Sequence, residues 1–120
     1  MTLTREQLLA MPQYTYELPI ACVEGWSTTQ RWTGVRLRDL ARLAGSADAG
    51  ELTSNSLEQG SSYGQVTYSE DQLHDGRALL ALRVNGVELS LDHGYPARVI
   101  IPAVPGVHNT KWIDSLMFGT

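Results

Sequence analysis

The sequence is poor in the residues that build several common kinds of site. Its 120 residues contain a single cysteine, Cys22, and a single lysine, Lys111. One cysteine can form neither an internal disulfide nor a zinc site made from paired cysteines. No apolar run approaches the roughly 18 residues that a membrane span needs. Nine basic residues stand against 13 acidic ones, a balance that disfavours the basic surface needed to bind nucleic acid.

The composition that remains is that of an ordinary globular protein. Hydrophobic residues make up 42% and charged residues 18%, with 11 glycines and 5 prolines. A chain of this length forms one domain, which we place over residues 1–120. The segment Met1–Ala10 carries Arg5 and Glu6 within a helical pattern, which excludes a signal peptide there.

Two short helices are predicted. Thr4 and Gln7 have the spacing of a capping box, and Pro12 ends the turns that follow. The second helix is indicated by apolar residues at i, i+3, i+4 and i+7, with Gly45 as the stop: Leu37, Leu40, Ala41 and Ala44.

Strands are expected to form most of the rest. Asn85-Gly86 between two apolar runs predicts a tight hairpin, and the polar segment Glu24–Thr33 is interpreted as a connection. The predicted strands are Tyr14–Val23, Leu52–Leu57, Tyr63–Tyr68, Leu79–Val84, Val87–Leu91 and Arg98–Ile101, with Thr110–Phe118 as a final one. The fold class is therefore α+β, mainly strands in mixed sheets with two short helices.

One generic catalytic pattern occurs, in a context that does not support it. Gly60–Gly64 reads G-x-S-x-G, but the alternating strand pattern of Gln65–Tyr68 follows it. A nucleophile elbow requires a helix after the serine, so a Gly/Ser turn is the better interpretation.

Cys22 has two interpretations that the sequence leaves open. A free cysteine is often a small buried hydrophobic residue. Cys22 also ends an extended segment just before a glycine-containing loop, where a thiolate would be presented as a nucleophile or a soft-metal ligand. A cysteine hydrolase would further need His93 or His108 beside it.

Two loops carry groups suited to an anion. His93 and Arg98 flank a turn marked by Gly94 and Pro96, and arginine offers a planar fork of donors for phosphate. The segment Pro105–Trp112 holds turn-forming residues whose backbone N–H groups can converge on an anion, with Lys111 adding a charge. The plainer alternatives are a solvated His and Arg, and a lysine packed on Trp112.

Longer stretches of the chain resemble a known family. Cys22-Val-Glu-Gly-Trp-Ser followed by Trp32-Thr-Gly-Val-Arg-Leu is similar to the molybdenum-ligand segment of the sulfite oxidase family of molybdopterin-dependent oxidoreductases. Leu80-Ala-Leu-x-Val-Asn-Gly, His93-Gly-Tyr-Pro-Ala-Arg, Pro102 and Thr110-Lys-Trp resemble the second signature of that family. The blocks stand in the family's order and cover most of the chain.

The resemblance implies a sulfite-oxidase-type molybdopterin-binding fold and a set of residue roles. Cys22 would supply a thiolate to molybdenum and is the implied catalytic and metal-binding residue. The implied contacts with molybdopterin are Ser56, His93, Arg98, Asn109, Thr110 and Lys111, with Lys111 as the partner of the phosphate charge. The implied cofactor is thus molybdenum-molybdopterin.

The implied activity is oxygen-atom transfer, with a sulfur centre of the sulfite or sulfoxide class as a small-molecule substrate and a separate electron-transfer partner. The alternative is a cofactor-free fragment or degenerate relative that acts as a binding module. The resemblance also implies that the chain lacks the family's leading strands, and an exposed sheet edge would favour homo-oligomers. The sequence of these motifs resembles that of actinobacterial relatives in which the domain is attached to membrane segments. This resemblance implies that the domain lies outside the cytoplasm.

Overall fold

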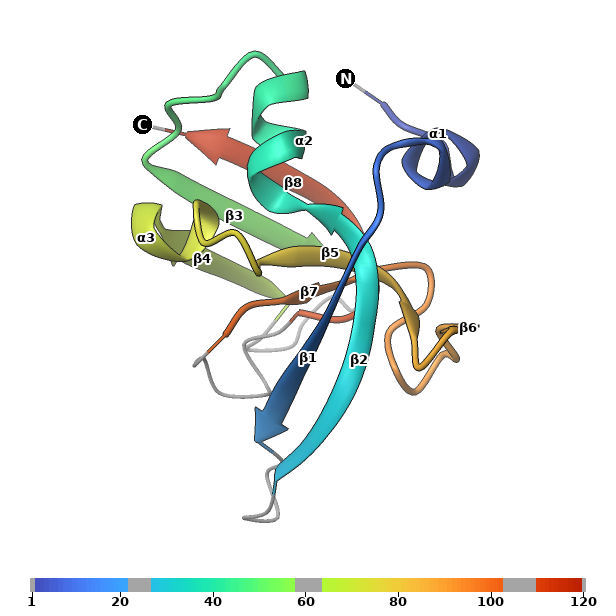
Figure 1. Cartoon of the computed structure of the whole chain (residues 1–120). Helices are drawn as coiled ribbons and strands as arrows, with labels where there is room; N and C mark the ends of the chain where they lie inside the picture. Colours follow the sequence, from blue (N-terminus) through green and yellow to red (C-terminus); the bar gives the residue numbers. More distant parts are fainter. Residues whose placement is uncertain (1, 22–26, 58–63, 103–109, 120) are drawn as a thin grey trace.

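The structure is a computed structural model, and it describes residues 2–21, 27–57, 64–102 and 110–119. These residues form three short helices and eight strands (Figure 1). In chain order the elements are α1 (Arg5–Ala10), β1 (Tyr14–Ala21), β2 (Ser27–Arg36), α2 (Leu37–Leu43), β3 (Glu51–Ser56), β4 (Gln65–Ser69), α3 (Glu70–Leu73), β5 (Leu79–Val84), β6 (Val87–Glu88), β7 (Arg98–Ile100) and β8 (Ile113–Gly119).

Both predicted helices are confirmed, and a third was missed. Thr4 caps α1 through a complete capping box with Gln7. The third helix, α3, has only four residues, too few for a recognisable periodicity. It begins with a second capping box, between Ser69 and Gln72, which was its one signal in the sequence.

The strands form two sheets in which every recorded pairing is antiparallel, whereas mixed sheets were expected. One sheet has the order β1-β2-β5-β6, with β7 also paired to β5, and the other has the order β4-β3-β8. The Asn85-Gly86 hairpin is confirmed, because both residues have positive φ angles (50° and 82°) between β5 and β6.

The ten-residue strand β2 corrects the prediction of a connection over Glu24–Thr33. Trp32 and Val35 lie on opposite faces of β2 and are both buried, because Val35 packs in the larger core cluster and Trp32 in a second one. The pairing of β2 with β5 also shifts register between Thr33 and Gly34. A Cβ atom at Gly34 would clash with the backbone carbonyl of Leu80 on β5. Close approach of two backbones therefore requires glycine in the middle of this strand.

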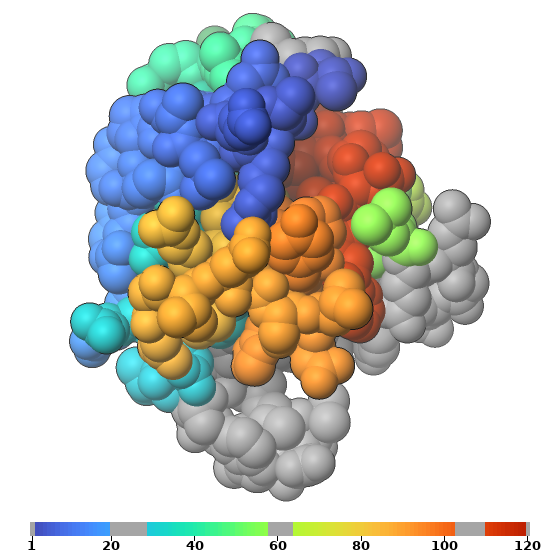
Figure 2. Space-filling view, turned by 90° about the vertical axis from the view of Figure 1, so that its right-hand side faces the viewer, coloured from blue at the N-terminus to red at the C-terminus, as the bar shows by residue number. Residues whose placement is uncertain are grey.

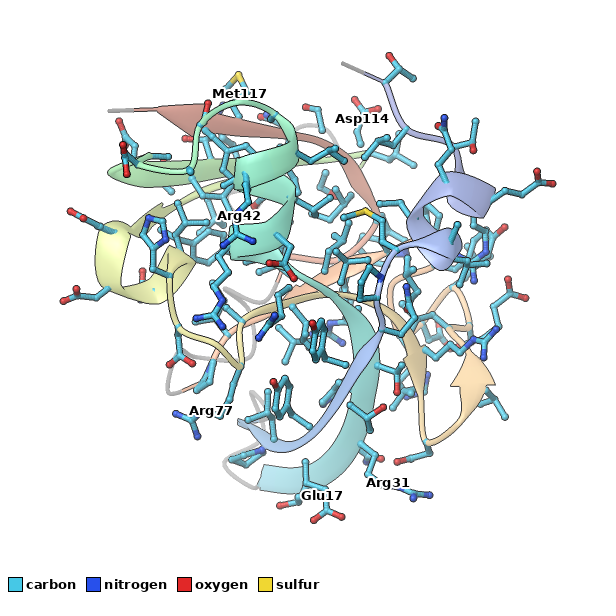
Figure 3. All side chains as sticks on the ribbon, turned by 45° about the horizontal axis from the view of Figure 1, so that its top comes forward. Glu17, Arg31, Arg42, Arg77, Asp114 and Met117 are labelled. Carbon is cyan, nitrogen blue, oxygen red and sulfur yellow. The ribbon has the colours of Figure 1, made fainter. Side chains whose placement is uncertain are left out.

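The core lies on both faces of β5. Leu80 and Leu82 join the larger cluster, which also contains residues of α2, β3 and β4, and Leu79 and Ala81 join a second cluster with Trp32. Burial on both faces explains why β5 reads as a continuous apolar run. Figure 1 shows β1 and β2 as a long arm that extends away from the β3-β4-β8 sheet. On this arm Glu17 lies opposite Arg31, and both project outward (Figure 3).

Candidate functional site

Arg98 opens β7 and is the most deeply buried charged residue in the described part of the chain. It is 4% exposed, and its Nη1 donates to the carbonyl oxygen of His93 at 3.3 Å. Its guanidinium carbon lies 5.1 Å from the centre of the Trp32 ring. Burial lowers the pKa of Arg98 to about 10, and the side chain is still a cation at neutral pH.

Gly94 brings the two predicted cations together. It has a φ of +113°, and a Cβ atom built there would lie 3.0 Å from Cβ of Arg98 and 3.2 Å from Cβ and Cγ of Lys111. The backbone N–H of Trp112 donates to the Gly94 carbonyl at 3.2 Å. The side chains of Arg98 and Lys111 therefore both leave the backbone next to this one glycine.

The loop that carries His93 and Gly94 is fixed from the N-terminal helix. Arg5 of α1 donates to the carbonyl of Pro96 at 3.0 Å, stacks 5.3 Å from the Tyr95 ring centre and forms a 2.9 Å salt bridge with Glu88. In Figure 2 the orange segment before β7 lies below the blue N-terminal segment and beside the red C-terminal segment. The contacts of Arg5 thus hold the loop against the body of the protein.

His93 is exposed, and its ring is engaged on one side. Its Nδ1 lies 2.8 Å from Oγ of Ser90, and the backbone N–H groups of residues 93–95 bond to the Ser90 carbonyl. His93 is linked to Arg98 through its carbonyl rather than through its ring.

Lys111 and Ser56 occupy the neighbourhood of Arg98 in different ways. The Nζ of Lys111 lies 5.6 Å from the centre of the Trp112 ring, as the plainer interpretation of this lysine expects. Ser56, at the end of β3, is 9% exposed and pairs with Ile113 of β8. Ile113 in turn donates its N–H to the carbonyl of Ala97, the residue before Arg98.

Thr110 is buried and uses its side chain inside the protein. Its Oγ1 lies 3.0 Å from Oγ of Ser54 and 2.9 Å from Oη of Tyr68, and its carbonyl accepts from the N–H of Val99 at 2.9 Å. Its role as a cofactor contact stays a prediction. The structure shows that its hydroxyl is engaged in the core.

Two predicted site residues, Cys22 and Asn109, lie outside the described residues, as does His108. The pattern Gly60–Gly64 also falls there except for its last residue, and a strand rather than a helix follows it. Within the four described segments, no group of three or more His, Cys, Asp or Glu side chains could hold a metal ion. No helix in those segments is both long and apolar enough to span a membrane.

Trp32 and Tyr68 are neighbours of the site that sequence reasoning missed. Trp32 is 1% exposed, lies against Arg98, and its Nε1 has no hydrogen-bond acceptor among the described residues. Trp32 had been assigned to a connection and Tyr68 to an ordinary strand, because nothing local to either residue indicates contact with Arg98 or Thr110.

Comparison with known proteins decides the family. The family model for the oxidoreductase molybdopterin binding domain matches residues 1–120. The chain belongs to this family. The domain is thus a molybdopterin-binding oxidoreductase domain of the sulfite oxidase and nitrate reductase type.

Several relatives and one solved structure resemble this molybdopterin-binding domain. It is 31% identical to the NADH nitrate reductase of Volvox carteri, over 95% of the chain and 17% of that protein. It is 31% identical to the oxidoreductase YuiH of Bacillus subtilis (98% and 59%) and 34% identical to the sulfite oxidase of Arabidopsis thaliana (71% and 25%). The sulfane dehydrogenase SoxCD of Paracoccus pantotrophus has a similar fold, with a TM-score of 0.87 and 24% identity over 99% of the chain and 35% of SoxCD.

The molybdopterin-binding domain spans between 17% and 59% of the length of these curated relatives.

Its described residues fit the phosphate end of molybdopterin. Arg98 is a buried cation, Lys111 starts beside it, and Gly94 leaves both side chains room that a Cβ would fill. Such a pair of cations suits a phosphate group.

Proposed function

We propose that this domain holds molybdenum-molybdopterin and catalyses oxygen-atom transfer at a sulfur centre of the sulfite or sulfoxide class. The observation that supports the proposal is that Arg98 and Lys111 both leave the backbone beside Gly94, in a chain that belongs to the molybdopterin-binding family. A guanidinium fork and a neighbouring ammonium give a phosphate monoester both charge and direction.

The residues of the chain would divide the work of binding between them. Arg98 and Lys111 would hold the phosphate, and the backbone around Asn109 and Thr110 would close over it. Cys22 would give its thiolate to molybdenum, in keeping with the preference of soft ligands for such metals. When bound, the cofactor supplies two-electron redox chemistry with transfer of an oxygen atom, and the protein supplies binding and orientation.

The sulfur-centre substrate is supported by the names of relatives. Sulfite oxidases of Arabidopsis thaliana, Homo sapiens and Gallus gallus are 34%, 32% and 35% identical to this chain over 71%, 74% and 74% of its length. A nitrate reductase of Hordeum vulgare is 33% identical over 78% of the chain, so nitrate belongs in any substrate panel. Oxidation of sulfite to sulfate takes one oxygen atom from water and releases two electrons and two protons. A separate electron-transfer partner would accept these electrons.

The experiment is metal analysis of the protein made in a host with an intact molybdopterin pathway. We expect about one molybdenum atom per chain, no molybdenum in Cys22→Ser, and a large loss in Arg98→Met. Arg83→Met is the matched control, since Arg83 lies on β5 with an exposed side chain and should keep the metal.

Loaded protein is then tested with sulfite, a sulfoxide and nitrate, together with artificial electron donors or acceptors. Turnover of nitrate alone would refute the sulfur-centre substrate while leaving the cofactor in place. A wild-type protein without molybdenum would refute the enzyme and favour the cofactor-free binding module.

A further inference from the structure

Three hydroxyl groups meet in the core behind the predicted phosphate site. Ser54 of β3, Tyr68 of β4 and Thr110 before β8 are 0%, 1% and 3% exposed. Thr110 stands at the centre, with its Oγ1 3.0 Å from Oγ of Ser54 and 2.9 Å from Oη of Tyr68. We call these three residues the hydroxyl cluster. It joins β3 and β4 to the segment that leads into β8, and these three strands lie side by side in Figure 1.

A buried hydroxyl needs a partner, because burial without one is costly and an apolar side chain of the same shape would avoid that cost. The hydroxyl cluster satisfies its members through one another. Ser54 Oγ also lies 3.4 Å from the Val66 carbonyl, and the Thr110 N–H lies 3.5 Å from Tyr68 Oη. The effect is to fix Thr110, through both its backbone and its side chain, against β3 and β4.

Fixing Thr110 also fixes where Lys111 begins. The Thr110 carbonyl accepts from Val99, the residue after Arg98, and the N–H of Trp112 donates to Gly94. Backbone hydrogen bonds therefore hold the residues on both sides of Lys111, with Thr110 bonded to Val99 and Trp112 bonded to Gly94. We call these two hydrogen bonds the clamp. Thr110 is the only member of the hydroxyl cluster in the segment that the resemblance assigns to the cofactor. Ser54 and Tyr68 act on that segment from outside it.

We propose that Ser54 and Tyr68 are positioning residues for the phosphate site, whose hydroxyls hold Thr110 so that Lys111 is presented beside Arg98. This inference rests on the proposed function, because it assigns the two residues to the binding of molybdopterin.

The variants that test it remove one hydroxyl each and keep the shape of the side chain: Tyr68→Phe and Ser54→Ala. Thr67→Ala is the matched control, because Thr53 and Thr67 form a 3.1 Å hydroxyl pair between the same two strands, in an exposed position. Leu40→Val is the control for lost stability, since Leu40 of α2 is buried in the larger core cluster and has no recorded bond to the hydroxyl cluster.

Two quantities are measured for each variant. The first is molybdenum retained per chain after dialysis, for protein from a molybdopterin-producing host. The second is the exchange rate of the Val99 and Trp112 amide hydrogens in cofactor-free protein, because both amides bond across the clamp. For Tyr68→Phe and Ser54→Ala we expect about fivefold less molybdenum and about fivefold faster exchange at these two amides, as loss of one buried hydrogen bond implies. Thr67→Ala should match the wild type in both.

The remaining outcomes separate the inference from the proposed function. Retention of molybdenum by Tyr68→Phe and Ser54→Ala would overturn the inference, as would an equal loss in Leu40→Val, which would show that stability alone is responsible. If the wild type itself lacks molybdenum, the proposed function fails and the inference fails with it. Faster exchange at Val99 and Trp112 would then describe only a structural clamp.

Discussion

Replacing Arg98 by methionine should separate binding of the cofactor from stability of the fold. Burial lowers the pKa of Arg98 to about 10, which corresponds to about 3 kcal/mol against the charged form, since one pKa unit is worth about 1.4 kcal/mol. Against this stand a 3.3 Å hydrogen bond to the His93 carbonyl and a cation–π contact with Trp32, each worth about 1 to 2 kcal/mol. The two contributions nearly cancel.

We therefore expect the cofactor-free Arg98→Met protein to unfold in urea with a free energy within about 1 kcal/mol of the wild type, a small change for a buried residue. Molybdenum retained per chain should nevertheless fall more than about tenfold, since a buried ion pair with phosphate is lost. Arg83→Met, on the exposed side of β5, should change neither quantity.

The direction of the pKa shift of Arg98 also determines how its contribution to folding stability changes with pH. The pKa of Arg98 is lower in the folded than in the unfolded chain, so the unfolded chain holds the proton more tightly. The penalty on folding is complete below about pH 10 and fades as the pH rises toward 12.5. Removal of Arg98 removes this penalty at neutral pH. A loss of several kcal/mol in cofactor-free Arg98→Met would refute this reasoning and show that the fold itself depends on the buried cation.

Three further changes test the geometry of the site and the sheet. Gly94→Ala should lower the free energy of unfolding in urea by about 2 kcal/mol or more and lower the molybdenum content, because its Cβ meets Arg98 and Lys111. Gly86→Ala is the control: Gly86 also has a positive φ but faces open space, so this variant should lose about 1 kcal/mol and keep the metal. Arg98→Lys should make molybdenum retention begin to fall at a lower pH than in the wild type, because the same burial lowers the pKa of a lysine, which is already below that of arginine; equal pH profiles would contradict this. Gly34→Ala should yield little folded protein by circular dichroism, because its Cβ meets the backbone of β5, and a folded, stable variant would show that β2 can shift.

The elements that could be predicted are those whose signals are local. The capping box of Thr4 and the Asn85-Gly86 turn are decided by residues within four positions of one another, and both are confirmed. β2 was missed because Trp32 and Val35 lie on opposite faces of the strand and pack in different core clusters, so no single apolar face marks it in the sequence. Antiparallel pairing throughout likewise depends on which strands meet in space, which the order of strands along the chain does not determine.

For the site, residue types were informative and environments were not. The sequence indicated that Arg98 and Lys111 suit an anion, and the structure places them on either side of Gly94. The burial of Arg98 could not be predicted, because Trp32 and Arg98 come from strands far apart in the sequence. The same holds for Thr110, whose partners Ser54 and Tyr68 precede it by 56 and 42 positions.

The enzyme and the cofactor-free binding module give different reasons for a buried arginine. In a protein that only had to fold, an apolar residue at position 98 would avoid a desolvation cost of about 3 kcal/mol. In a protein that binds a phosphate ester, the cost is incurred before the ligand arrives, and the ligand's negative charge then offsets it. The buried guanidinium then binds the phosphate more strongly, because it has little water to lose when the phosphate approaches. The burial of Arg98 therefore supports the enzyme over the binding module, and the small stability change expected for cofactor-free Arg98→Met tests whether the fold by itself needs this arginine.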